Sequence, residues 1–125
     1  MREYDPPAFY AHTKCCEVIL AELWAERLAQ SGVAVHSMHS GWADTPGVET
    51  SLPRFHKLMG PLLRDAGQGA DTIVWLVGSA EAAAKSGAFW HDREPRPTHR
   101  MSRTKETTAD RERLWDECER LAGLA

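Results

Sequence analysis

The stretch from Ala8 to Gln30 constrains the fold of this chain most strongly. It holds few charged residues, and no proline or glycine interrupts it. Asp5 can cap a helix here, and Pro6 and Pro7 suit the first turn, where a missing N–H costs nothing. We therefore expect a helix over 8–30 that ends before Gly32. Its wide apolar surface favours cover from a sheet and from a neighbouring helix or a second subunit.

Strand and helix patterns alternate along the rest of the chain. We expect short strands at 33–38 and 88–91, and helices at 52–59, 64–77 and 108–122. A crossover that contains a helix joins the two strands, so they should run parallel. Two parallel strands make a poor sheet by themselves. The fold class is therefore α/β, in the order helix-strand-loop-helix-strand-helix, and resembles half of an open domain.

Local patterns add finer expectations. Ser51 would cap the helix at 52–59, and Thr108 would cap the last helix. Glu22 and Glu26, four residues apart, would mark a narrow solvent strip on the first helix. We treat 1–125 as a single partial domain. It divides into a lead (1–7), an α/β part (8–91) and a C-terminal excursion with its helix (92–125).

Composition excludes several classes of protein. A length of 125 residues leaves room for one domain, and a net charge of −3 gives no general electrostatic case for binding nucleic acid or an anionic membrane. No apolar run is long enough to span a bilayer. The three cysteines are an odd number and two are adjacent, which argues against a disulfide framework. We therefore expect reduced thiols and a cytoplasmic protein.

Tyr10 and Lys14 lie four residues apart on the first expected helix and so share one face. A lysine ammonium in this position stabilises the phenolate form of a tyrosine. A phenol that exchanges its proton more readily is suited to general acid–base catalysis. The spacing YxxxK is common, however, and the pair also fits an ordinary surface contact on a helix.

A turn rich in glycine and proline follows the first expected strand, with the sequence HSGWADTPG over 39–47. Open α/β sheets bind ligands beyond the carboxyl ends of their strands. Gly41 allows the backbone to approach a flat ring closely. Backbone groups near Trp42 and Ala43 could hydrogen-bond a carboxamide, and the Thr45 hydroxyl could do the same or reach a phosphate. The alternative is an ordinary turn that connects a strand to a helix.

Together the two patterns resemble the catalytic half of a short-chain dehydrogenase/reductase. That family carries YxxxK on a long helix, then a strand and a Pro-Gly-x-x-x-Thr loop, which residues 40–45 match with Ser40 in place of the proline. The segments 39–48 and 68–76 are also similar to the family's orphan member 12 branch, and retinol dehydrogenase-like members are more distant. The resemblance is weakest after about Arg93. It implies the C-terminal half of a Rossmann-like, doubly wound parallel sheet, incomplete as a stand-alone domain.

The resemblance also implies a function and a site. The chain would be part of an NAD(P)-dependent oxidoreductase that transfers hydride between nicotinamide and a small carbonyl or alcohol substrate. Tyr10 would be the catalytic acid/base, assisted by Lys14. The residues implied to contact the NAD or NADP cofactor are Lys14, Gly41, Trp42, Ala43 and Thr45. Those implied to line the substrate, beneath a lid formed by 46–63, are Trp42, Leu52, Phe55 and Met59.

Two features of the family have no match in this chain: the glycine-rich phosphate-binding loop and the catalytic serine that precedes the tyrosine. Every glycine lies after position 31, so no glycine-rich strand–turn–helix precedes Tyr10, and no serine precedes it either. We therefore expect the chain alone to bind NAD or NADP weakly and to be inactive. The alternative function is a non-catalytic module that associates with itself through the helix at 8–30.

Two further patterns favour no site. His36 and His39 have the spacing HxxH, but a metal site needs three or four converging ligands, and no other Cys or His is suitably placed. We expect no metal centre. The basic stretch 93–105 lacks interleaved aromatic residues, so a solvated loop is favoured over a contact with nucleic acid.

Overall fold

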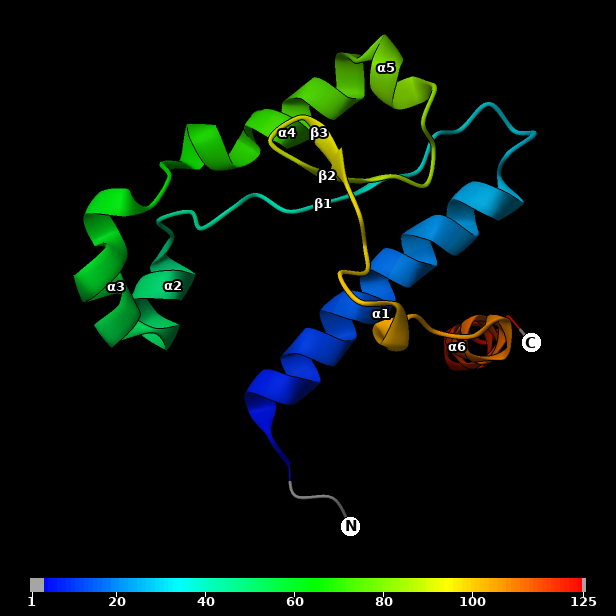
Figure 1. Ribbon diagram of the computed structural model, residues 1–125, viewed down its shortest axis with the longest axis horizontal. Coiled ribbons are helices and arrows are strands. Elements are labelled where there is room, and N and C mark those ends of the chain that lie inside the picture. The colour runs from blue at the N-terminus through cyan, green and yellow to red at the C-terminus, as the bar shows by residue number, and fades with distance from the viewer. Residues whose placement is uncertain (1–3, 125) are drawn as a thin grey trace.

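A long helix, α1, opens the computed structural model, which describes residues 4–124 (Figure 1). It spans Pro6–Arg27. Asp5 is its N-cap and accepts a hydrogen bond from the Ala8 N–H at 3.4 Å, as predicted from the sequence. The helix ends three residues earlier than expected, and the chain then turns at Gly32, whose φ is +74°.

The sheet is small and has three strands in the order β1-β2-β3. The bounds are Ser37–Met38 for β1, Phe89–His91 for β2 and Glu94–Arg96 for β3. Strands β1 and β2 run parallel, with Ser37 opposite Phe89, which confirms the expected parallel pair. The first strand is much shorter than the predicted 33–38: only Ser37 and Met38 pair with β2, although the Val35 carbonyl still accepts from the Gly87 N–H at 2.7 Å. In Figure 1, α1 and β1 run in opposite directions, as consecutive helix and strand do in an α/β unit.

Strand β3 is absent from the sequence prediction, which treated 92–106 as an irregular excursion. It pairs antiparallel with β2, and a two-residue turn at Asp92 and Arg93 joins them. Both turn residues have positive φ, 56° and 59°, the conformation of a tight type I′ hairpin turn. Neither residue is asparagine or glycine, so the usual sequence signal for this turn is lacking.

Five helical segments connect β1 to β2. They are α2 (Pro46–Ser51), α3 (Pro53–Met59), the 3₁₀ turn η1 (Gly60–Leu62), α4 (Ala66–Gly78) and α5 (Ala80–Ala83). The prediction that Ser51 caps a helix is wrong: Ser51 ends α2, and α3 starts at Pro53 without a side-chain cap. Helix α4 instead has a full capping box between Asp65 and Gln68.

The chain ends with a short 3₁₀ turn, η2 (Ser102–Thr104), and the helix α6 (Thr108–Ala122). Thr107, not the expected Thr108, is the N-cap, and it forms a capping box with Asp110. Gly123 follows the helix with φ +70°, a left-handed C-cap.

Helix α6 packs against α1. The rings of Trp24 and Trp115 meet edge to face with centroids 4.9 Å apart, and the Arg27 guanidinium lies 3.7 Å from the Trp115 centroid. Arg111 of α6 donates to Glu22 at 2.6 Å and to Glu26 at 2.9 Å. Of the expected solvent strip, Glu26 is exposed as predicted, whereas Glu22 is half-buried beside Arg111. A neighbouring helix does cover α1, as its apolar surface predicted.

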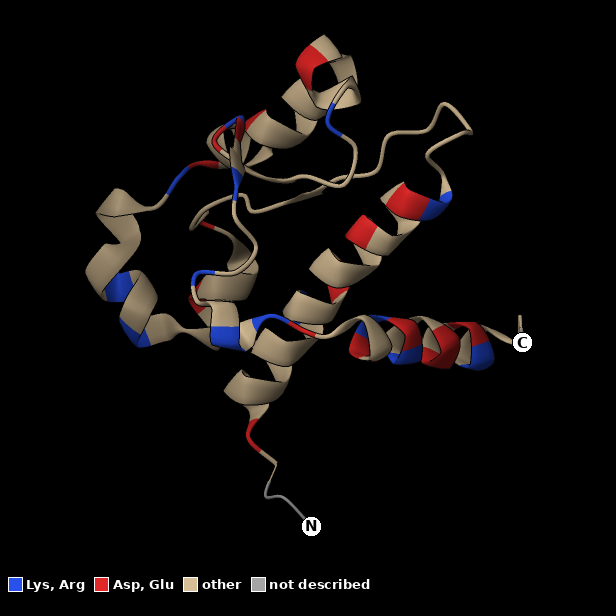
Figure 2. Ribbon diagram, turned by 45° about the vertical axis from the view of Figure 1, so that its right-hand side comes forward, with Lys and Arg blue, Asp and Glu red and all other residues tan. Residues whose placement is uncertain are grey.

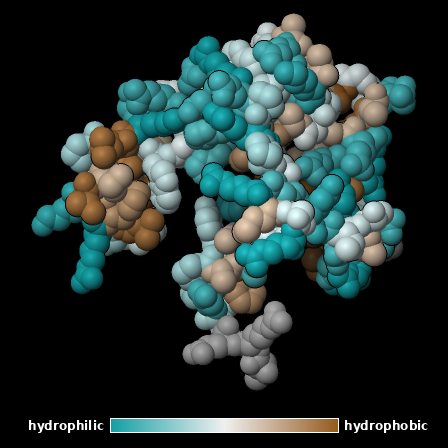
Figure 3. Space-filling model, in the orientation of Figure 1, coloured by the Kyte–Doolittle hydropathy of each residue, from teal (hydrophilic) through white to brown (hydrophobic). Residues whose placement is uncertain are grey.

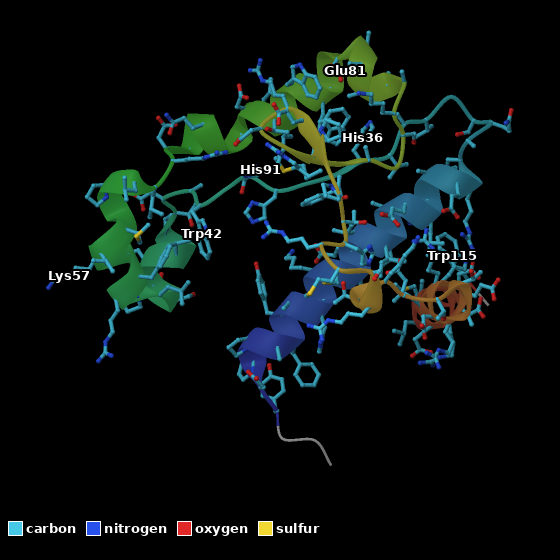
Figure 4. The ribbon with its side chains drawn as sticks, in the orientation of Figure 1. His36, Trp42, Lys57, Glu81, His91 and Trp115 are labelled. Atoms are coloured by element: carbon cyan, nitrogen blue, oxygen red, sulfur yellow. The ribbon has the colours of Figure 1, made fainter. Side chains whose placement is uncertain are left out.

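The largest fully buried side chain among the described residues is Trp90 on β2, with an exposed fraction of 0%. Its indole N–H donates to Nδ1 of His36 at 3.1 Å, and its ring meets Trp75 of α4 at 5.1 Å between centroids (His36 is labelled in Figure 4). Burial lowers the pKa of His36, which keeps that nitrogen available as an acceptor near neutral pH. The other buried apolar residues of the described chain are Ala82 of α5 and Leu23 and Ala25 of α1.

No helix within residues 4–124 is both long and apolar enough to cross a bilayer.

Candidate functional site

Tyr10 and Lys14 lie on the N-terminal half of α1, and the helix brings them together as predicted. The Lys14 ammonium is 5.9 Å from the centroid of the Tyr10 ring. It also forms an ion pair with Glu17 at 2.7 Å, and this hydrogen bond raises the pKa of Lys14. The lysine therefore stays charged near neutral pH beside a phenol that is 67% exposed.

The turn after β1 is held by a residue that the sequence analysis did not single out, Arg64. Its backbone N–H donates to the carbonyl of Trp42 at 2.9 Å, and its carbonyl accepts from the Asp44 N–H at 2.8 Å. Its guanidinium donates to the Ser40 carbonyl at 3.2 Å and to both carboxylate oxygens of Asp92. No spacing rule could have identified this contact, because Asp92 lies 28 residues further along the chain.

Gly41 lies directly over that guanidinium. Its φ is +76°, and a Cβ built there would be 2.7 Å from Cζ of Arg64. The glycine is therefore required both for the backbone conformation and for the close approach of the arginine. The sequence predicted that Gly41 would allow close approach of a flat ring; in the structure the Arg64 guanidinium makes that close approach.

Replacing Gly41 by alanine should destabilise the protein by roughly 1–3 kcal/mol, because the new methyl group needs a positive φ and displaces Arg64. The control is Gly60→Ala. Gly60 has a right-handed φ of −43°, and an added Cβ would meet nothing within 4 Å. Chemical denaturation of both variants checks the prediction. Equal losses of stability would show that the turn at Gly41 does not have this structure.

The hairpin turn of β2 and β3 locks the same region. Asp92 binds Arg64, and the neighbouring Arg93 binds Asp71 of α4, with Nε to Oδ2 at 2.7 Å. The hydrogen bond from Arg64 lowers the pKa of Asp92, and that from Arg93 lowers the pKa of Asp71. The first ion pair ties the positive-φ turn to Arg64, which also binds the Ser40 carbonyl beside Gly41, and the second ties the turn to α4.

The Asp92 carboxylate should make stability depend on pH. The pKa of Asp92 in the folded protein lies below its ordinary value of 3.8. The ionised carboxylate therefore adds fully to the free energy of unfolding above pH 3.8, and this stabilisation is lost as the pH falls through the folded-state pKa. We expect the Asp92→Asn variant to lose less stability on acidification than the parent chain, because it has no carboxylate at this position to protonate. Denaturation midpoints measured from neutral to strongly acidic pH test this. Asp116→Asn is the control, because Asp116 has no ion pair among the residues that the structure describes. If the denaturation midpoint of Asp92→Asn falls with decreasing pH as steeply as that of the parent chain, the stabilising role given to the Asp92 carboxylate is contradicted.

Ala43 presents its peptide to the side away from Arg64. The backbone of Arg64 forms hydrogen bonds with Trp42 and Asp44, the residues before and after Ala43. Ala43 and Arg64 therefore form an isolated parallel bridge, in which the N–H and C=O of Ala43 point away from Arg64. Neither group has a hydrogen-bond partner among residues 4–124. Gly69 of α4 packs behind it, where an added Cβ would lie 3.1 Å from that of Ala43. The result is a rigidly held backbone edge with one free donor and one free acceptor.

The remaining predicted residues lie beside Ala43 in sequence or in the helical segments that follow it. Thr45 is the N-cap of α2, and its hydroxyl oxygen accepts from the Val48 N–H at 3.3 Å. Trp42 is 56% exposed and stacks against Phe55 of α3, with centroids 4.7 Å apart (Trp42 is labelled in Figure 4). Leu52 links α2 to α3, and Met59 ends α3. The structure thus brings Trp42 and Phe55 together, with both helices of the expected lid beside them.

The two groups of predicted residues are not joined by a contact. Within residues 4–124, no hydrogen bond or ring contact links Tyr10 or Lys14 to residues 41–45. Two surface hollows lie elsewhere, along α1 near Glu22 and Glu26. The two groups therefore form separate clusters within the described structure.

Sequence comparison identifies the class of protein to which this chain is similar. Dehydrogenase/reductase SDR family member 12 of Bos taurus is 43% identical over 121 residues, which are 95% of this chain and 38% of the relative. The Homo sapiens protein of that name is 44% identical over 123 residues, with the same coverage. Retinol dehydrogenase 13 of Mus musculus is 32% identical over 134 residues, or 39% of its length. No family model matches the chain.

In sequence, the chain belongs with the short-chain dehydrogenase/reductases. Its resemblance to that oxidoreductase family, and to member 12 within it, is confirmed. The chain spans well under half the length of these relatives.

Proposed function

We propose that this chain supplies the nicotinamide- and substrate-facing part of an NAD(P)-dependent short-chain dehydrogenase/reductase, in the C-terminal half of a Rossmann-like sheet. The observation that carries the proposal is the free peptide edge of Ala43. It follows the parallel strand β1 and is held in place by Arg64. Ligands of open α/β sheets bind beyond the carboxyl ends of such strands.

The residues present fit a nicotinamide ring. A carboxamide has one acceptor oxygen and an NH₂ donor, which are complementary to the free N–H and C=O of Ala43. Gly41 holds the turn in its positive-φ conformation against Arg64, and the Thr45 hydroxyl retains a proton to donate. Lys14 would bind the ribose hydroxyls. Bound nicotinamide would supply the hydride.

Tyr10 would move the proton. In carbonyl reduction the hydride forms a bond to the carbonyl carbon, and the oxygen takes a proton from the Tyr10 hydroxyl. In alcohol oxidation the same hydroxyl, as phenolate, accepts the proton. The Lys14 ammonium lies 5.9 Å from the centroid of that ring and would offset the negative charge left on the Tyr10 oxygen when its proton is transferred.

The lid favours a substrate with an apolar body. Trp42 and Phe55 form an aromatic pair next to the Ala43 edge, and Leu52 and Met59 lie on the same helical segments. We therefore propose an apolar carbonyl or alcohol as the substrate class. The chain alone should bind NADH or NADPH weakly, because contacts to the adenosine half of the cofactor are not provided by these residues.

A chimera tests the proposal. Residues 1–125 would replace the matching segment of the bovine relative, and transfer of hydride from NADH and NADPH would be followed with a panel of apolar aldehydes and ketones. We expect turnover comparable with that of the unmodified relative. A folded chimera that is inactive on substrates which the relative reduces would contradict the proposed function.

A further inference from the structure

One face of the lid points away from the proposed site. It consists of residues of α3 and η1 at helical spacing, and we call it the outer lid face: Arg54, Lys57, Leu58, Pro61 and Leu62. All five are exposed, Leu58 to 79% and Leu62 to 77%. Figure 3 shows hydrophobic surface on this part of the molecule, which protrudes at the left edge.

The opposite side of the same helix explains why these residues face outward. Phe55 stacks on Trp42, and His56 hydrogen-bonds Asp44 at 2.9 Å. Met59, one turn further on, is also half-buried. Because one side of α3 is already turned to the segment that holds the proposed site, Leu58 and Leu62 cannot contact it. They project from the outside of the lid.

The charge of this segment differs from that of the whole chain. No acidic residue occurs from Ser51 to Arg64, although the net charge of the protein is −3. Arg54 and Lys57 have no ion pair within the described part of the chain, whereas Arg64, Arg93 and Arg111 are each bound to carboxylates. Figure 2 shows only positive charge along α3, and Figure 4 shows Lys57 extending away from the molecule.

Exposed leucines beside unpaired cations fit a particular kind of surface. A lipid bilayer accepts protruding apolar side chains without needing a complementary groove, and long cationic side chains reach its headgroups while their stems stay apolar. Each basic residue near an anionic leaflet adds favourable binding free energy. We propose that the outer lid face docks on an anionic membrane surface, with Leu58 and Leu62 inserted at the headgroup boundary.

Such docking goes beyond the redox function and does not depend on it. It would place the substrate-facing lid at the lipid surface, where apolar substrates concentrate. The binding would be peripheral, since the outer lid face is only two short helical segments long.

Vesicle flotation of the 125-residue chain tests the proposal. We expect binding to vesicles of phosphatidylcholine with about one third phosphatidylserine, and much weaker binding to phosphatidylcholine alone. Leu58→Glu should abolish it. Arg54→Gln together with Lys57→Gln should weaken it about 25-fold, about fivefold for each cation, and added salt should weaken it in the same direction.

Val77→Glu is the matched control. Val77 on α4 is 87% exposed and apolar but has no basic residue beside it on its helix. The Val77→Glu variant should bind anionic vesicles as the parent chain does. Circular dichroism should show that every variant keeps its helices. The proposal is overturned if the parent does not bind anionic vesicles, if it binds both vesicles equally, or if Val77→Glu loses binding while Leu58→Glu keeps it.

Discussion

Replacing Trp90 by alanine is expected to lower the free energy of unfolding by roughly 3–5 kcal/mol, the largest effect on stability in this chain. Trp90 is fully buried on the central strand β2. Its removal would leave a cavity bounded by Trp75 and would deprive the half-buried His36 of its hydrogen-bond donor. Few other side chains are buried, so the remaining core cannot compensate.

Two variants make this prediction specific. Trp42→Ala removes the same ring from an exposed position and should cost much less. Trp90→Phe keeps an aromatic ring but loses the indole N–H that donates to His36. Its loss in free energy of unfolding should lie between those of Trp90→Ala and Trp42→Ala. Urea denaturation followed by circular dichroism measures all three. Similar losses for Trp90→Ala and Trp42→Ala would show that Trp90 is not at the centre of the core.

Replacing Tyr10 by phenylalanine is expected to reduce kcat for hydride transfer in the chimera by about 10²–10⁴-fold. The variant keeps the ring beside Lys14 and loses only the hydroxyl that exchanges the proton. The affinity for substrate should change little, so the loss should fall on kcat and not on KM. Stopped-flow or steady-state measurement of NADH oxidation provides the rates.

Tyr4→Phe is the matched control for Tyr10→Phe. Tyr4 is also exposed, but alanine occupies the position four residues later, so no ammonium lies one turn away. The Tyr4 variant should keep full activity. Undiminished turnover in Tyr10→Phe would remove Tyr10 from the mechanism, whereas an inactive parent chimera would contradict the wider proposal instead.

The elements with local signals were predictable from the sequence. Asp5 and the two prolines predicted the start of α1, and its apolar surface predicted the cover that α6 provides. The parallel pairing of β1 with β2 followed from the helical crossover between them. The YxxxK spacing placed Tyr10 and Lys14 on one face because helix geometry is independent of context.

The features that escaped prediction depend on contacts between distant residues. Strand β3 forms because Asp92 and Arg93 are held at positive φ by Arg64 and Asp71, partners far away in the sequence. The role of Arg64 at the Gly41 turn is equally non-local. Glu22 and Glu26 fit a solvent strip by spacing, and only the packing of α6 brings Arg111 to them.

The measurement that tests the central proposal most directly is an NMR titration of the 125-residue chain with two halves of the cofactor. Reduced nicotinamide mononucleotide should shift the amide signals of Gly41, Ala43 and Thr45 and the side-chain signals of Lys14 at high ligand concentration. Adenosine monophosphate, at the same concentration, should shift none of them. Equal effects of the two ligands, or nicotinamide-induced shifts confined to other parts of the chain, would contradict the account.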